Sequence, residues 1–238
     1  MIDHLPRVYV ALDMDNAADA DRLTEALAGS GCGLKVGKEL FTAVGPDWVR
    51  RHVDAGFSLF LDLKYHDIPN TVARACRVAA GMGVDLLNVH AAGGGPMMSA
   101  ALAAVRAVNP RTHLIAVTVL TSMDEQTMHA TGVSGPVADQ VERLGRLAAE
   151  AGLDGVVCSA REASAMREVF GPRGMLVTPG IRPSWAATDD QHRVMTPAEA
   201  ISAGASSLVI GRPITGADDP FGAWMRIHEE IEQAQAGD

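Results

Sequence analysis

Short runs of apolar residues alternate with longer segments of helical periodicity along the whole chain. The runs are rich in β-branched and aliphatic residues, and Gly, Pro, Asp or Asn bounds each of them, which is typical of buried strands. We expect strands at residues 8–12, 34–36, 57–61, 85–89, 113–119, 155–158, 175–177 and 207–210. The segments between them predict helices at residues 17–28, 71–80, 97–108, 137–151, 162–170, 197–203 and 221–234.

Strands that alternate with helices over 238 residues predict a closed (β/α)8 barrel, or TIM barrel, for which about 250 residues is typical. An open doubly wound sheet is the alternative, but ALDMDN follows the first strand where that fold carries GxGxxG. No linker, repeat or low-complexity tract divides the chain, so we expect one α/β domain over residues 1–238. The active site of such a barrel lies at the carboxyl ends of its strands.

Composition and charge narrow the class of protein. The chain has 20 Lys and Arg against 29 Asp and Glu, and a net charge of −9 argues against a binder of nucleic acid or of an anionic membrane. Cys32, Cys76 and Cys158 are widely spaced, which favours reduced thiols over disulfides or a metal site. The first residues carry acids where a signal peptide would be apolar. We therefore expect a cytoplasmic protein without a membrane span.

Charged residues gather at the predicted ends of the first three strands. The chain has three lysines, and two of them, Lys35 and Lys64, lie within or directly after apolar runs. Asp13, Asp62 and Asp67 are close to the same strand ends. Because neighbouring strands end at one rim, we expect these groups to meet there. Such an array can stabilise negative charge developing on a substrate carbon, and a lysine between carboxylates can deliver a proton. The alternative is a set of ion pairs that only neutralise one another.

A phosphate site is expected near the end of the barrel sequence. The last strand leads into LVIGRPIT, where Gly211 permits close approach of the backbone and Arg212 supplies a fixed positive charge. The long preceding loop, TPGIRPSWAATDDQHRV, carries Arg182 and Gln191 and has the length of a lid. The alternative for the Gly-Arg pair is a helix cap beside a surface arginine.

Other polar residues at the strand ends give weaker signals. His90 is either a catalytic group or a packed histidine of the core. Thr121 and Ser122 either bind a heterocyclic amide or cap a turn. His66 lies inside the charged motif, but the chain has no HxH or HExxH spacing, so we expect no metal site.

The chain resembles the orotidine 5′-phosphate decarboxylase family in motifs that follow the family's order: ALD, LKVGKELF, FLDLKYHDIPNTV, VTVLTSM, PGIRP with DDQHRV, and VIGRPIT. The pattern DxKxxDIPxT is characteristic of this family, and PGIRP separates it from sugar-phosphate relatives that share DxKxxD. Tyr65 stands where the family often has Phe. The resemblance implies decarboxylation of orotidine 5′-phosphate to uridine 5′-phosphate without a cofactor, the last step of pyrimidine nucleotide synthesis.

The resemblance also implies a role for each matching residue. Lys64 would donate the proton within an array of Lys35, Asp62, Lys64 and Asp67. Asp13 and Lys35 would bind the ribose hydroxyls, and Thr121 would contact the pyrimidine. The phosphate would be held by Arg182, Gln191, Gly211 and Arg212, with Pro179 at the start of the lid. Asp67 and Thr71 would reach the neighbouring subunit's site, which implies a homodimer with shared active sites.

Two other functions remain open at this point. One is a magnesium-dependent sugar-phosphate decarboxylase or aldolase of the same superfamily, against which the DIPNT and PGIRP segments count. The other is a non-catalytic nucleotide-binding barrel, which the complete set of charged residues disfavours. Sensitivity to a chelator would indicate the first, and binding of uridine monophosphate without turnover would indicate the second.

Overall fold

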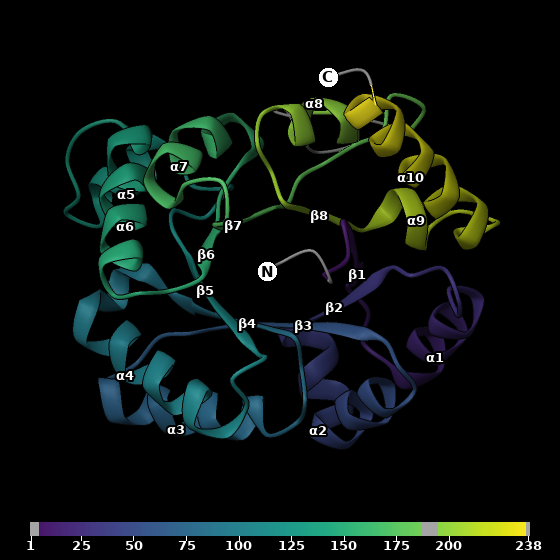
Figure 1. Ribbon diagram of the computed structural model, residues 1–238, viewed down its shortest axis with the longest axis horizontal. Helices are drawn as coiled ribbons and strands as arrows, with labels where there is room; N and C mark the ends of the chain where they lie inside the picture. Colours follow the sequence, from purple (N-terminus) through teal and green to yellow (C-terminus); the bar gives the residue numbers. More distant parts are fainter. Residues whose placement is uncertain (1–4, 187–194, 237–238) are drawn as a thin grey trace.

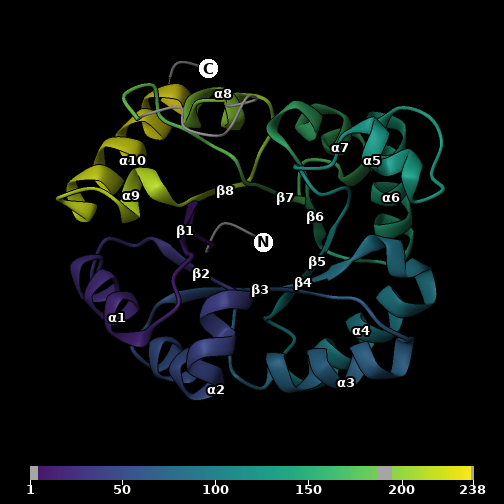
Figure 2. The same ribbon diagram turned by 180° about the vertical axis from the view of Figure 1, so that it is seen from behind.

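A ring of parallel strands forms the centre of the molecule, with helices around its outside (Figures 1 and 2). The computed structural model describes residues 5–186 and 195–236. Within this part of the chain the strands are β1 (Val8–Leu12), β2 (Gly33–Gly37), β3 (Ser58–Tyr65), β4 (Leu86–His90), β5 (His113–Val117), β6 (Gly155–Val157), β7 (Met175–Thr178) and β8 (Ser207–Ile210). Each strand pairs with the next, and β1 pairs with β8 through Val8 and Leu208, which closes the barrel. The predicted (β/α)8 barrel is confirmed, and the open doubly wound sheet is excluded.

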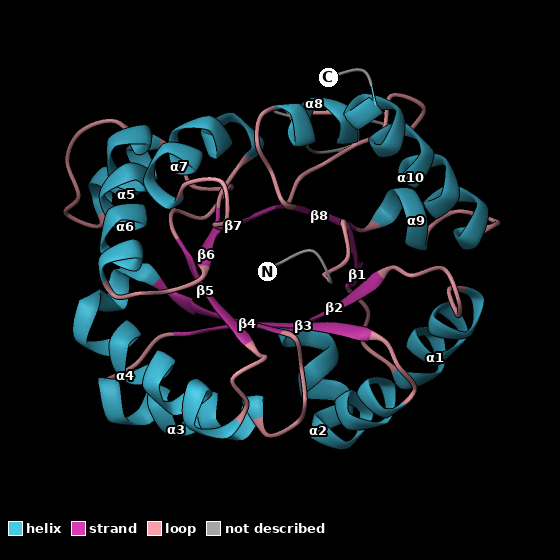
Figure 3. Ribbon diagram, in the orientation of Figure 1, coloured by secondary structure: helices cyan, strands magenta, loops and turns pink. Residues whose placement is uncertain are grey.

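The helices lie outside the ring and follow the strands in sequence (Figure 3). Their bounds within the described residues are α1 (Ala17–Ala26), α2 (Lys38–Asp54), α3 (Pro69–Ala80), α4 (Gly94–Val108), α5 (Glu125–Ala130), α6 (Val137–Glu150), α7 (Ala163–Phe170), α8 (Pro197–Ser202), α9 (Arg212–Thr215) and α10 (Pro220–Ala236). Short 3-10 turns, η1 (Ala91–Gly93) and η2 (Ala160–Glu162), precede α4 and α7. No helix in these parts of the chain is long and apolar enough to cross a membrane.

Alternation of side chains along β1 separates two apolar layers. All five residues of β1 are buried, but Val8, Val10 and Leu12 pack into the outer core beneath the helices. Tyr9 and Ala11 point the other way, into the barrel interior. There the ring of Tyr9 meets that of Phe60 edge-on, with centroids 5.8 Å apart. The interior of the barrel thus contains a packed apolar layer formed by residues such as Tyr9, Ala11 and Phe60.

The strand and helix bounds differ from expectation in two informative places. Nothing in the pattern predicted a helix between the second and third strands, yet α2 occupies that segment. Its periodicity is interrupted because Gly45 has a non-helical backbone and Pro46 follows it. The third strand was expected to end at residue 61, whereas β3 continues to Tyr65 through a register irregularity. That extension carries two of the candidate site residues.

Candidate active site

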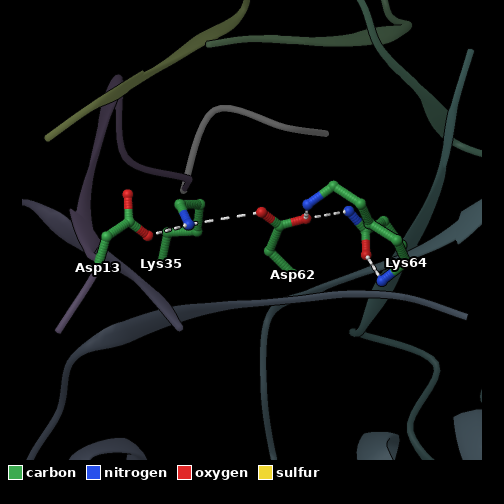
Figure 4. A network of polar contacts seen from close by, with 5 residues as sticks. Asp13, Lys35, Asp62 and Lys64 are labelled. Carbon is green, nitrogen blue, oxygen red and sulfur yellow. Dashed lines mark hydrogen bonds and ion pairs between the residues drawn. The ribbon is translucent and has the colours of Figure 1, made fainter. Parts of the chain in front are cut away.

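An alternating row of carboxylates and amines lies at the carboxyl ends of β1, β2 and β3 (Figure 4). The ammonium of Lys35 lies 3.0 Å from Oδ1 of Asp13 and 3.5 Å from Oδ2 of Asp62. The ammonium of Lys64 lies 2.6 Å from Oδ1 of Asp62. The order Asp13, Lys35, Asp62, Lys64 therefore places each inner charge between two charges of opposite sign, which confirms the expected convergence of these four residues.

The row passes from solvent into the protein. The side chain of Asp13 is 65% exposed, whereas those of Lys35 and Asp62 are only 9% and 12% exposed. Lys64 is intermediate, at 27%. Charges with so little access to water interact more strongly than a surface pair does, and their fixed partners hold them in place. The four charges therefore form a preorganised electrostatic field. Lys64 lies at one end of the row, next to the buried carboxylate of Asp62.

Gly37 provides the space in which the Lys35 ammonium lies. The residue pairs in register with Asp62 on the next strand. A Cβ atom at this position would lie 3.3 Å from Nζ of Lys35 and 3.6 Å from Oδ1 of Asp13. The backbone angles of Gly37 are ordinary extended ones, so its value here is the missing side chain and not a special conformation. Any larger residue would press on the lysine where it meets its two carboxylates.

Lys64 has an unusual backbone conformation. Among the described residues other than glycine, it has the only positive φ, 53°. It lies where the register of β3 against β4 shifts between Leu61 and Tyr65. Left-handed backbone at such a residue costs about 1–3 kcal/mol and is typical of functional sites. In a regular strand Asp62 and Lys64, two residues apart, would share a face; here the irregular register and the positive φ of Lys64 accompany their contact.

Asn88 is a site residue that the sequence analysis did not identify. It lies in β4 and is fully buried. Its side-chain amide donates to Oδ1 of Asp62 at 2.6 Å, and its carbonyl oxygen accepts from the backbone N–H of Lys64 at 2.8 Å. The available signal was an amide two residues after the inward-facing Leu86 in an otherwise apolar strand. A polar side chain at an inward position near a strand end is a candidate for the site.

Asp67 and Thr71 lie in the segment after β3 and in the first turn of α3. Asp67 is exposed, and its carboxylate accepts from the backbone N–H of Ile68 at 2.6 Å. Thr71 is exposed in the first turn of α3. Among the described residues, Asp67 forms no ion pair with either lysine of the array, so the expected meeting of three carboxylates in one subunit is not seen.

A pocket of about 490 Å³ lies beside the ends of β5, β6 and β7. Thr121 and Ser122 line it from the segment after β5, and Pro179 lines it from the segment after β7. The predicted pyrimidine contact and the predicted start of the lid thus share one cavity. Its wall also includes Met195, where the described chain resumes.

The residues expected to bind phosphate follow β7 and β8. Gly211 comes directly after β8, and a Cβ atom on it would lie 3.5 Å from that of Ala11 and 4.0 Å from Oδ2 of Asp13. Arg212 begins the short helix α9 and is exposed. Arg182 is buried, and its backbone N–H donates to the carbonyl of Met195 at 3.1 Å. Gln191 lies outside the described residues.

His66 and His90 form a stacked pair next to the array, with ring centroids 5.4 Å apart. Burial lowers the pKa of His90 below its ordinary value, and the nearby His66, Lys38 and Lys64 lower it further. Within the described structure Nδ1 of His90 is buried without a hydrogen-bond partner. These surroundings favour the neutral form of the His90 ring.

The fold and this rim define a class: a (β/α)8-barrel enzyme with alternating amines and carboxylates at the carboxyl ends of its first strands. The sequence pattern of the Orotidine 5′-phosphate decarboxylase / HUMPS family matches residues 6–227. The chain belongs to this family.

Individual relatives agree with the family match. The orotidine 5′-phosphate decarboxylase of Idiomarina loihiensis is 56% identical over 227 residues, which cover 95% of this chain and 98% of that protein. That of Halorhodospira halophila is 55% identical over 229 residues, covering 96% of this chain and 97% of that one. A crystal structure of orotidine 5′-phosphate decarboxylase from Lactobacillus acidophilus superposes with a TM-score of 0.86 at 37% identity, covering 95% of this chain and 99% of that one.

Proposed function

We propose that this protein decarboxylates orotidine 5′-phosphate to uridine 5′-phosphate, the last step of pyrimidine nucleotide synthesis. The observation that carries the proposal is the row Asp13, Lys35, Asp62, Lys64 in a chain that belongs to this family. The reaction breaks the bond between C6 of the pyrimidine and the carboxylate carbon. Carbon dioxide leaves, and the electron pair stays on C6, where no neighbouring carbonyl delocalises it well.

Lys64 is the proton donor in this proposal. Its ammonium is held by Asp62 at 2.6 Å, and it is the array's less buried amine. A cation at C6 stabilises the electron pair as it forms, and transfer of a proton from Nζ to C6 completes uridine 5′-phosphate. The neutral amine then regains a proton from water. Asp62 near the substrate carboxylate adds repulsion that departure of carbon dioxide relieves.

Residues on both sides of the mouth bind the rest of the nucleotide. Asp13 and Lys35 bind the ribose hydroxyls, and Thr121 contacts the pyrimidine from the pocket at the end of β5. The phosphate is held by Arg182, Gln191, Gly211 and Arg212, with Pro179 at the start of the segment that closes over it. Binding energy gained at the phosphate, remote from C6, is then available to organise and dry the reacting end.

We further propose a homodimer in which Asp67 and Thr71 complete the partner's site. Both residues are exposed, and among the described residues the carboxylate of Asp67 forms no ion pair with Lys35 or Lys64. Ile68, between them, is 67% exposed, and Val78 of α3 is 59% exposed. Apolar side chains of this size on the same segment favour contact with another surface.

A cytoplasmic location is also proposed, and the free thiols of all three cysteines support it.

An absorbance assay for loss of orotidine 5′-phosphate, run with and without EDTA, tests the proposed function. We expect turnover that the chelator leaves unchanged. Activity that EDTA abolishes and magnesium restores would favour the metal-dependent sugar-phosphate alternative. Binding of uridine 5′-phosphate by a folded protein that never consumes orotidine 5′-phosphate would indicate the non-catalytic nucleotide-binding barrel.

A further inference from the structure

We propose that Asn88 is a positioning residue that fixes the direction of the Lys64 ammonium. This inference rests on the proposed decarboxylation, because it concerns the group that would protonate C6. Asn88 itself is fully buried in β4 beneath the array, where it acts on the reaction only through Asp62 and Lys64.

The three residues form a closed ring of hydrogen bonds. The backbone N–H of Lys64 donates to the carbonyl oxygen of Asn88 at 2.8 Å, and the amide of Asn88 donates to Oδ1 of Asp62 at 2.6 Å. The ring closes where the ammonium of Lys64 donates to the same Oδ1 at 2.6 Å. A carboxylate only accepts and a backbone N–H only donates, so one orientation of the Asn88 amide satisfies both partners.

The ring holds together an irregular part of the sheet. Leu61 pairs with Leu87, but the next paired residues are Tyr65 and Val89, so β3 has three residues where β4 has only Asn88. Within this bulge Lys64 takes its left-handed conformation, with φ of 53°. The regular ladder is broken here, and the side chain of Asn88 takes the place of a strand partner for the Lys64 N–H. Asn88 therefore holds both ends of the lysine, the backbone directly and the ammonium through Asp62.

Few other side chains could do this. A leucine has nearly the same size but neither donor nor acceptor, so it would leave the Lys64 N–H without its acceptor and Oδ1 of Asp62 with only the Lys64 ammonium as donor. An aspartate would still accept from Lys64, but it cannot donate to Asp62 when ionised and would repel that carboxylate. Asn88→Leu thus removes the contacts with both Lys64 and Asp62, whereas Asn88→Asp removes only the contact with Asp62. Both substitutions keep the volume of the side chain almost constant.

Kinetics of Asn88→Leu and Asn88→Asp with orotidine 5′-phosphate provide the first measurement. A misplaced proton donor predicts a fall in kcat of about a hundredfold with KM changed by less than about threefold. Thr112→Val is the matched control, because Thr112 is also fully buried and its hydroxyl donates to the carbonyl of Val84 at 2.7 Å, away from the site. Loss of kcat by the same factor in the control would overturn the proposal, as would unchanged kcat in both folded Asn88 variants.

Lysine NMR provides a second measurement that requires no turnover. The chain has three lysines, so labelling lysine at the ε-carbon gives three side-chain signals, which Lys64→Arg and Lys38→Arg assign. In Asn88→Leu we expect the Lys64 signal to move toward that of exposed Lys38, whose own signal stays in place. An unmoved Lys64 signal would overturn the proposal.

The two measurements separate this inference from the proposed function. If the wild-type protein does not consume orotidine 5′-phosphate, the proposed function fails, whereas the Lys64 signal still decides whether Asn88 positions the amine. If Asn88→Leu does not fold, Asn88→Asp, which keeps the size and the acceptor, decides in its place: a moved Lys64 signal supports the role and an unmoved one overturns it.

Discussion

The ammonium of Lys64 donates to Oδ1 of Asp62 at 2.6 Å although the two residues are only two apart on one strand. In a regular strand both side chains would point to the same face of the sheet and lie parallel to each other. Here the bulge and the positive φ of Lys64 turn the amine back onto its neighbour. The cation is therefore oriented by the backbone as well as by charge.

Replacement of Lys64 by alanine should remove both the cation near C6 and the proton donor. We expect Lys64→Ala to lower kcat by many orders of magnitude, at least about ten-thousandfold, the combined scale of acid catalysis and electrostatic stabilisation. Thermal melting should show that the variant stays folded. Lys38→Ala is the control, because Lys38 is exposed at the start of α2. Substantial activity in folded Lys64→Ala would remove Lys64 as the donor.

Gly37→Ala should disturb the array without disturbing the fold. The new methyl group would lie 3.3 Å from the Lys35 ammonium, which is the mobile end of a long side chain and can shift. We expect a loss of about tenfold in kcat/KM from this displacement, with an almost unchanged melting temperature. Gly95→Ala is the control, since a Cβ there meets no atom within 4 Å. Equal activity of the two variants would show that Lys35 does not need this space.

Arg212→Ala should act mainly on the phosphate end of the substrate. We expect kcat/KM for orotidine 5′-phosphate to fall by about a hundredfold, the scale of one charge-assisted contact, and kcat/KM for orotidine without phosphate to fall far less. Arg173→Ala serves as the control, since Arg173 is also exposed but lies next to the start of β7, at the other end of the barrel. Equal losses for the two substrates would contradict the phosphate role.

Two inactive variants should restore activity when mixed. Lys64→Ala lacks the proposed donor, and Asp67→Asn lacks the carboxylate proposed to act in the partner's site. A hybrid dimer would contain one intact site, so exchange of subunits should recover about a quarter of the wild-type activity, on random pairing of the two chains. Mass spectrometry of the intact dimers confirms exchange. Proven exchange without recovery would show that the site is not shared.

Stability should decline in acid through His90. Burial, together with His66 and the charges of Lys38 and Lys64, lowers the pKa of this ring below its ordinary 6.5. The unfolded chain takes up a proton near pH 6.5, whereas the native ring resists it until a lower pH. The contribution of His90 to the free energy of unfolding is therefore complete above pH 6.5, and it is lost as the pH falls from 6.5 through the lower pKa of the native ring.

Denaturant unfolding between pH 8 and pH 5 measures this effect. The free energy of unfolding should fall more steeply for the wild type than for His90→Gln, and His129→Gln at an exposed position should follow the wild type. A His90→Gln protein whose stability falls as steeply as that of the wild type would show that another group governs the acid side.

The sequence was sufficient for the barrel and for most of the charged row. Apolar runs placed β1 and β8 with the observed bounds, and lysines beside such runs indicated the array. The bulge in β3 could not be predicted in this way, because it depends on the pairing of β3 with β4. Asn88 was missed for the same reason: its partners are set by that register and are 24 and 26 residues away in the chain.

Asp13 and Gly211 stand on either side of the seam at which β1 meets β8 and the ring closes. In the proposed function, Asp13 binds the ribose directly after β1, and Gly211 binds the phosphate directly after β8. A nucleotide bound in this position would contact both the first and the last strand of the barrel. Binding of the nucleotide would then stabilise the closure of the barrel, because a ligand that binds only the native protein raises its free energy of unfolding.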